Sequence, residues 1–263
     1  MLSSAGRGTD AAVNSAATAL IVTVTLVVAY VLGRWLRPLL SADHLSADSK
    51  DAVKFAMGLV ATMAALLLGL LVSSAKSNYD ATRSQVIEMS AKVAFLDRVL
   101  SLYGPETHGA RRALRDVVVD ATRRIWPKDA ATVADLGPNV QAGDAFFEEM
   151  QALEPKNDGQ RALKTQAMSL AVELGELRVL LQAQSIPSVS TTMLVVVVCW
   201  LVVIFFASSL LAPPNAMTGL ALVAAAGSVA GALFLILELD APFAGMLHVP
   251  SAPLLAALQH IDQ

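Results

Sequence analysis

The sequence predicts an all-α integral membrane protein, with four transmembrane helices and a helical-bundle soluble domain inserted between spans 2 and 3. Hydrophobic residues make up 55% of the 263 residues and charged residues only 16%, whereas a typical soluble domain is about 25% charged. Four stretches stay apolar for the roughly 20 residues that a helix needs to cross a bilayer. Between the second and third stretches, apolar residues repeat at helical spacing.

The four spans are predicted at about residues 13–32, 53–73, 189–212 and 216–237. The first is too long for the apolar region of a cleaved signal peptide and is followed by Arg34, Trp35 and Arg37, so we interpret it as a retained anchor. Only Pro213-Pro214-Asn215 separates spans 3 and 4, which predicts an antiparallel hairpin. The expected domains are therefore a membrane pair (1–74), a soluble domain (75–188), a membrane hairpin (189–237) and a C-terminal tail (238–263).

The predicted soluble domain holds 14 of the 19 Lys and Arg residues together with 15 acidic residues. Its helices end at breaks that contain glycine or proline, namely Gly104-Pro105, Trp126-Pro127, Gly137-Pro138 and Pro155. Three apolar seams recur at steps of three and four: Val86, Met89, Val93, Leu96, Leu100 and Tyr103; Leu114, Val117, Ala121 and Ile125; and Leu163, Ala167, Leu170, Leu174, Leu177 and Leu181. Because neither glycine nor proline interrupts Leu70 to Leu102, span 2 is expected to continue unbroken into this domain.

Lysine and arginine near the span ends do not decide which side of the membrane the soluble domain occupies. The loop between spans 1 and 2 carries four such residues, and the domain side carries five. Long domains are discounted in the positive-inside rule, and discounting this one reverses the comparison. Both orientations therefore remain open at this point.

Residue patterns typical of catalysis are absent from the sequence, so we predict no enzyme activity, no cofactor and no metal site. The four histidines, His44, His108, His248 and His260, are widely separated, and Cys199 lies in span 3, where a buried thiol is inert. Glu238 and Asp240 are interpreted as the solvated end of span 4. A net charge of −3 gives no indication of nucleic-acid binding.

Small residues form one face of span 2. Gly58, Thr62, Ala65, Gly69 and Ser73 recur at steps of three and four, and Lys76 continues this face beyond the span. Such a face lines a pore or packs against another helix. The pore hypothesis places these six residues on the wall and at the vestibule of an anion pathway. In span 4, Gly219, Gly227 and Gly231 are predicted to mediate helix packing.

Five arginines gather on a short helix of the soluble domain, namely Arg111, Arg112, Arg115, Arg123 and Arg124. They suit an anionic ligand or headgroup. Asp116 and Asp120 lie among them, however, and a solvated face with salt bridges is the commoner explanation.

Two stretches resemble a known family. One contains Leu68-Gly69-Leu70-Leu71-Val72-Ser73-Ser74-Ala75-Lys76-Ser77 with Leu96-Asp97-Arg98 and Tyr103-Gly104-Pro105-Glu106; the other is Glu238-Leu239-Asp240-Ala241-Pro242-Phe243-Ala244-Gly245. The chain is similar over nearly its whole length to the bacterial bestrophin-like family, whose name implies kinship with the bestrophins, pentameric anion channels. The resemblance implies the same order of spans, a pore lined by span 2 and a cytoplasmic soluble domain. Bestrophins narrow their pore with bulky apolar residues, whereas this face has only small ones.

The expected function is thus a homo-oligomeric anion channel in the bacterial inner membrane, a pentamer by analogy, with the lipid bilayer and an inorganic anion as its partners. A non-conducting, membrane-anchored scaffold or sensor, whose helical domain binds a partner, is the alternative. A central pore requires several subunits around an axis, because four helices enclose little space. A scaffold has no such requirement.

Overall fold

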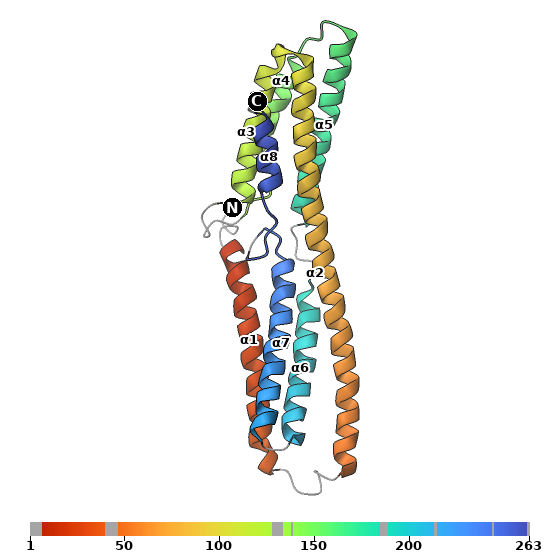
Figure 1. Cartoon of the computed structure of the whole chain (residues 1–263), viewed down its shortest axis with the longest axis vertical. Helices are drawn as coiled ribbons and strands as arrows, with labels where there is room; N and C mark the ends of the chain where they lie inside the picture. Colours follow the sequence, from red (N-terminus) through yellow and green to blue (C-terminus); the bar gives the residue numbers. More distant parts are fainter. Residues whose placement is uncertain are drawn as a thin grey trace. The chain divides into compact units, whose positions relative to one another are not determined.

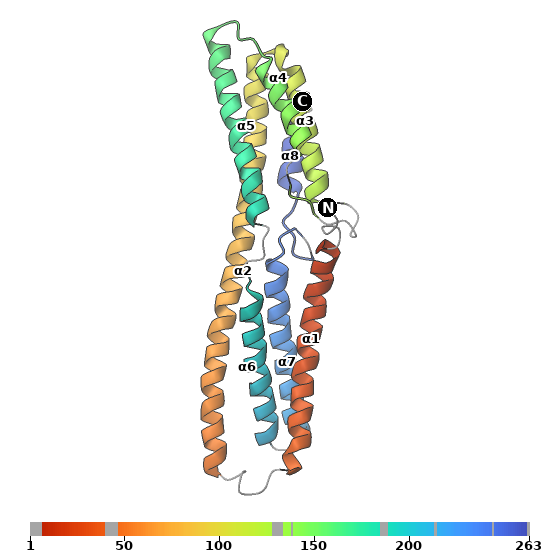
Figure 2. The ribbon, with the colours of Figure 1, turned by 180° about the vertical axis from the view of Figure 1, so that it is seen from behind.

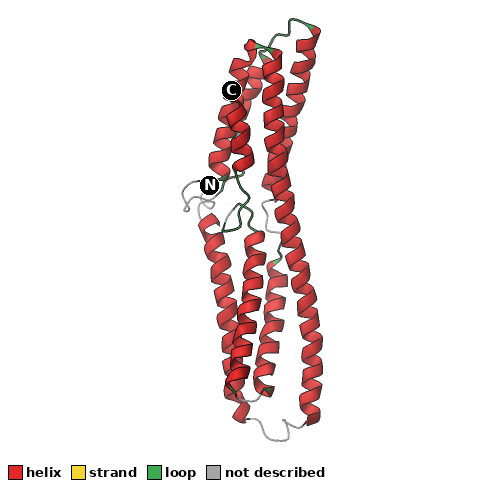
Figure 3. Cartoon of the chain, in the orientation of Figure 1, coloured by secondary structure: helices red, strands yellow, loops and turns green. Residues whose placement is uncertain are grey.

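The computed structural model describes residues 7–39, 47–127, 134–137, 139–184, 189–212, 215–243 and 245–261. Within these ranges the regular secondary structure is helical throughout (Figure 3). The longer helices are α1 (Arg7–Leu36), α2 (Ala47–Tyr103), α3 (His108–Ile125), α4 (Val140–Gln151), α5 (Asp158–Gln184), α6 (Thr191–Leu211), α7 (Ala216–Leu239) and α8 (Ala252–Ile261). Short 3-10 turns follow α1, at Arg37–Leu39, and precede α3, at Pro105–Thr107.

Four of these helices, α1, α2, α6 and α7, are long and apolar enough to cross a membrane. They coincide with the four predicted spans, so the prediction of four long apolar helices is confirmed. The connection between α6 and α7 contains Pro213 and Pro214, which lie outside the described residues. The two helices run side by side in opposite directions, as both views show (Figure 1, Figure 2).

The chain forms two compact units. The first, here called the apolar unit, comprises the described parts of Ala12–Ser77 and Pro187–Asp240. The second, the bundle unit, comprises the described parts of Asn78–Ile186 and Ala241–Gln263, together with residues 7–11 at the start of α1. Helix α2 belongs to both, because the boundary between Ser77 and Asn78 falls inside it. The prediction that span 2 continues without a break is therefore confirmed.

The apolar unit is built around large side chains from all four of its helices. Leu26 of α1, Leu71 of α2, Val197 of α6, and Leu233 and Ile236 of α7 are almost completely buried in one cluster. At one end of the unit, the Arg37 guanidinium donates a hydrogen bond to the carbonyl of Ala212, the residue that follows α6.

The bundle unit has its own core, formed by the second half of α2 with α3, α4, α5 and α8. The predicted α2 seam, from Val86 to Tyr103, is buried in full. Of the α5 seam, Ala167, Leu170, Leu177 and Leu181 are buried, and Leu163 and Leu174 pack against the core. Gly104 ends α2 with a φ of +132°, which L side chains rarely adopt, and Pro105 follows it.

The last part of the chain completes this core. Residues 252–261 form helix α8, and Leu254, Ala257 and Ile261 are buried in the cluster. On the neighbouring helix, Arg111 donates to the Ile261 carbonyl over 3.3 Å, which holds the end of α8 against α3. The segment expected only as a tail is thus a structural part of the bundle unit.

Candidate pore-lining stripe and the groups around it

The small residues of α2 lie on one exposed face of the helix. Here this face is called the α2 stripe, and its members are Gly58, Thr62, Ala65, Gly69, Ser73 and Lys76; all six are exposed in the single chain. A Cβ added at Gly58 or Gly69 would meet no atom within 4 Å. Packing within the chain therefore gives no reason for glycine at either position.

Three faces can be distinguished on α2 from a helical rotation of about 100° per residue. Ala64, Leu71 and Ala75 are buried and face the other helices of the apolar unit. An exposed row of large apolar side chains lies on another face: Leu59, Met63, Leu66 and Leu70. The α2 stripe lies roughly a quarter turn from this row and more than a third of a turn from the buried face.

The polar groups of the α2 stripe are modest. The Thr62 hydroxyl donates to the Gly58 carbonyl over 2.9 Å, so its proton is used within the helix and its oxygen remains an acceptor. Lys76 therefore supplies the cation of the stripe, and it is exposed, as are Asp80 and Arg83 farther along the same helix. A stripe of this kind offers a narrow, weakly polar surface, with Lys76 at one end, one turn before Asp80.

The three glycines predicted to pack in span 4 differ from one another. Gly219 faces Tyr30 of α1, whose hydroxyl oxygen would be 3.0 Å from an added Cβ. Gly227 and Gly231 are exposed, and a Cβ on either would meet no atom within 4 Å. Contact within the chain therefore accounts for Gly219 alone, and packing by the other two remains a prediction about contacts outside this chain.

The tightest glycine contact lies at Gly33 of α1, which sequence reasoning missed. A Cβ there would collide with the Ser209 hydroxyl of α6 and would lie 2.7 Å from the Phe206 carbonyl oxygen. Helices α1 and α6 therefore approach closely at this position. A single glycine near the end of an apolar helix resembles an ordinary helix end, so no sequence pattern indicates the contact.

The two carboxylates at the end of α7 are not solvated ends, and that interpretation was wrong. Glu238 is only 2% exposed and accepts a hydrogen bond of 2.5 Å from the Ser15 hydroxyl of α1, which is also buried. Asp240 accepts from the backbone N–H of Val189, just before α6, at 3.2 and 3.3 Å. These carboxylates join the ends of three helices of the apolar unit.

The arginines of α3 mostly have partners within the bundle unit. Arg111 forms a two-bond pair with buried Asp97, with Nε–Oδ1 at 2.6 Å and Nη2–Oδ2 at 3.0 Å, and this hydrogen bonding raises the pKa of Arg111. Arg124 pairs with Asp135 at 2.8 Å, while Arg123 is exposed. Structural pairing therefore explains Arg111 and Arg124 without an anionic ligand.

Arg178 of α5 adds a second guanidinium to the Arg124–Asp135 contact. It donates to the Gly137 carbonyl over 3.1 Å, and desolvation by burial lowers its pKa. Since Arg124 also donates to this carbonyl, at 3.4 Å, the two arginines fasten the segment around Gly137 to helices α3 and α5. Arg124, Arg178 and Asp135 therefore have a structural role.

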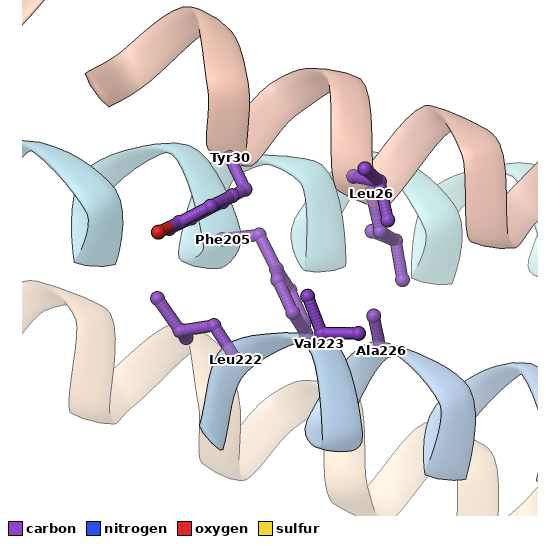
Figure 4. A pocket seen from close by; sticks show the side chains of 7 residues that line it. Leu26, Tyr30, Phe205, Leu222, Val223 and Ala226 are labelled. Atoms are coloured by element: carbon purple, nitrogen blue, oxygen red, sulfur yellow. The ribbon is translucent and has the colours of Figure 1, made fainter. Parts of the chain in front are cut away.

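Figure 4 shows a small apolar crevice inside the apolar unit. It is too narrow to hold a water molecule. Its lining comes from α1, α6 and α7: Leu26, Val27, Tyr30, Phe205, Leu222, Val223 and Ala226. Apart from the Tyr30 hydroxyl, these side chains are apolar, so the crevice has the chemistry of a packing defect and not of an ion pathway.

Groups suited to metal binding do not come together in the described part of the chain. Among those residues no cluster of three or more His, Cys, Asp or Glu has the geometry to hold a metal ion. Cys199 is exposed on α6, so the expectation of a buried thiol was wrong. His44 lies outside the described residues.

Comparison with known proteins gives one match. The model of the Bestrophin-like domain matches residues 21–254, which includes α2, α6 and α7, the second half of α1 and most of the bundle unit. Neither a curated protein nor a solved structure matches the chain. Because the matched region covers most of the sequence, this chain belongs to the bestrophin-like family.

Proposed function

We propose that the protein spans a membrane through α1, α2, α6 and α7 and assembles with further copies of itself into an anion channel lined by the α2 stripe. The observation that supports this most directly is the exposure of the stripe. Its six small or basic residues are exposed in the single chain, and no contact within the chain explains its glycines. A face that is small, polar in part and distinct from the large apolar row suits the wall of a shared pore.

Among the described residues, the apolar unit is packed with large side chains, and the crevice between α1, α6 and α7 is apolar. Neither feature suits an ion pathway inside a single subunit. Conduction would therefore require a ring of subunits, and a pentamer is the expectation by analogy with the bestrophins. We place the chain in the bacterial inner membrane with the bundle unit on the cytoplasmic side, by the same analogy.

Subunit number is the first test. The purified protein is reconstituted in nanodiscs, and its mass is measured by native mass spectrometry. A closed ring of about five copies is expected. A stable monomer or dimer would leave no room for a central pore, and the channel proposal would be abandoned.

Halide flux from liposomes then tests the α2 stripe itself. Thr62→Trp is expected to block flux by filling the pore, whereas Met63→Trp, about 100° around the helix on the large apolar row, is the matched control and should conduct. Lys76→Glu should reduce or invert the preference for anions, because it replaces the positive charge of the stripe with a negative one. Equal conduction by the Thr62 and Met63 variants would remove the stripe from the pathway.

A second function is favoured by a separate observation in the bundle unit. Phe95 and Leu102 of α2 lie two turns apart on one face and are 48% and 57% exposed. Exposed large apolar side chains at helical spacing suit a protein partner, as the scaffold alternative requires. Three results together would support this function over the channel. The protein would form few subunits, conduct no ions, and bind a partner that the Phe95→Ser variant no longer binds.

A further inference from the structure

The connection between α7 and α8 carries an unusual exposed pair. Met246 is 80% exposed and Leu247 is 41% exposed. Residues 241–261 contain no Lys, Arg, Asp or Glu. Large apolar side chains at the tip of a loop, in an uncharged stretch, are costly in water and suit a less polar environment.

The shape of this loop is fixed by contacts within the bundle unit. The Val249 backbone N–H donates to the Pro242 carbonyl over 2.8 Å, which ties the two ends of the loop together. Between them Gly245 has a φ of +82°, which turns the chain immediately before Met246. The tip therefore belongs to a loop whose two ends are held together by a hydrogen bond.

Trp126 fastens the loop to the end of α3. Its indole Nε1–H donates to the Val249 carbonyl over 2.7 Å, and its ring meets that of Phe243 edge to face, with the centroids 5.9 Å apart. Arg123, which is exposed, lies in the last turn of α3, three residues before Trp126. An indole thus stands at the base of an apolar loop, with an exposed basic residue close to it in the sequence, a combination that suits the boundary between lipid and water.

Chain connectivity brings the loop to the end of a span. Asp240 follows α7 directly, and its bond to the Val189 N–H holds it at the start of α6. Met246 is six residues farther along, which limits its distance from Asp240 to about 20 Å. Because Pro242 and Val249 are tied together, both ends of the loop start close to the point where α7 ends.

We propose that Met246 and Leu247 insert into the lipid headgroup region beside the end of α7, where Arg123 attracts anionic headgroups. The loop is then a lipid contact that belongs to the bundle unit and is additional to the four spans. This inference rests on the proposed membrane insertion of those spans. The occupant is lipid and not a second copy of the chain, because the loop follows a span so closely.

Fluorescent labels at single cysteines test the contact on the full chain in nanodiscs. In a Cys199→Ser background, Met246→Cys is labelled with an environment-sensitive fluorophore. Leu220→Cys, on the exposed face of α7, serves as the label expected inside the membrane. Val140→Cys, which replaces an exposed apolar residue of α4 in the bundle unit, is the matched control. Nanodiscs contain either zwitterionic lipid alone or an added anionic lipid, with a quencher on the acyl chain near the headgroup.

The inference expects a blue shift and strong quenching for the label at position 246, and neither for the label at 140. Arg123→Gln should reduce quenching at position 246 only in nanodiscs that contain anionic lipid. Quenching at 220 without quenching at 246, or equal quenching at 246 and 140, would overturn the lipid contact. The absence of quenching at 220 would instead overturn membrane insertion of α7, and with it the proposed function.

Discussion

Asp97 and Arg111 form a largely buried ion pair in the bundle unit. Both carboxylate oxygens accept from the guanidinium, at 2.6 and 3.0 Å, and the side chains are only 8% and 20% exposed. The pair joins α2 to α3, and through the Ile261 carbonyl Arg111 also reaches the end of α8. Asp97, which belongs to the Leu96-Asp97-Arg98 triplet of the family motif, thus has a structural role.

Asp97→Ala should therefore leave a poorly solvated cation and destabilise the bundle unit. The expected loss is about 3 kcal/mol, at the lower end for a broken buried pair, because Arg111 keeps some contact with water. Thermal unfolding in detergent, followed by circular dichroism, measures the change. Lys156→Ala, which breaks the exposed pair with Glu106, is the control and should shift the midpoint far less. Equal shifts in the two variants would mean that the Asp97–Arg111 pair stabilises the protein no more than the exposed Lys156–Glu106 pair does.

Gly33→Ala should destabilise the apolar unit. The added methyl group would lie 2.7 Å from the Phe206 carbonyl oxygen, and a backbone atom can move only with its helix. Overpacking of this kind costs about 1–3 kcal/mol. Gly69→Ala is the matched variant, since its methyl group meets no atom within 4 Å in the chain. Thermal unfolding of monomeric protein in detergent should separate the two, and a Gly69 variant as unstable as the Gly33 variant would contradict the packing described for α1 and α6.

Two adjacent leucines test whether α8 is part of the core. Leu254 is 1% exposed, and Leu255 is 46% exposed. Leu254→Ala should destabilise the protein by about 2–4 kcal/mol, through lost burial and the cavity that remains. Leu255→Ala should change the unfolding midpoint little. Indistinguishable midpoints for the two variants would mean that α8 does not pack as described.

Acid should weaken the bundle unit through two carboxylates near its surface, Glu106 and Glu173. Hydrogen bonds from Lys156 and Lys92 lower the pKa of Glu106 and of Glu173, respectively, below the ordinary 4.5. A carboxylate whose pKa is lower when folded stabilises the protein above pH 4.5, and that contribution disappears as pH falls through the lowered values. The thermal unfolding midpoint should thus be lower at pH values below 4.5 than above it. This decrease should be smaller in the Glu106→Gln, Glu173→Gln double variant. The same pH profile in both proteins would assign the acid sensitivity to other groups.

Local patterns in the sequence were sufficient for the helices but not for their contacts. The absence of glycine and proline after Leu70 predicted the unbroken α2, and spacing predicted the seam from Val86 to Tyr103. Glu238 could not be predicted as buried, because its partner Ser15 is 223 residues away. Because α3 and α8 lie far apart in the sequence, the contact of Arg111 with Ile261 could likewise not be predicted.

The candidate site shows the same division. The α2 stripe was predicted from residue size and spacing, and its exposure follows from the way α2 packs in the apolar unit. Gly33 has no such pattern, because its constraint comes from Ser209 and Phe206 of another helix. A pore wall also depends on other copies of the chain, so residues of one chain identify only the surface that one subunit brings to it.

The place of α8 in the core has a consequence for biosynthesis. The ribosome makes the central helices of the bundle unit first, but Leu254, Ala257 and Ile261 emerge only after α6 and α7 have been synthesised. At about 5–20 residues per second, the roughly 75 residues after Ile186 delay completion by some 4–15 s. During that interval the nascent bundle unit lacks α8 and exposes the apolar surface that α8 later covers. Chaperones that shield such surfaces should therefore engage this chain before α8 is released.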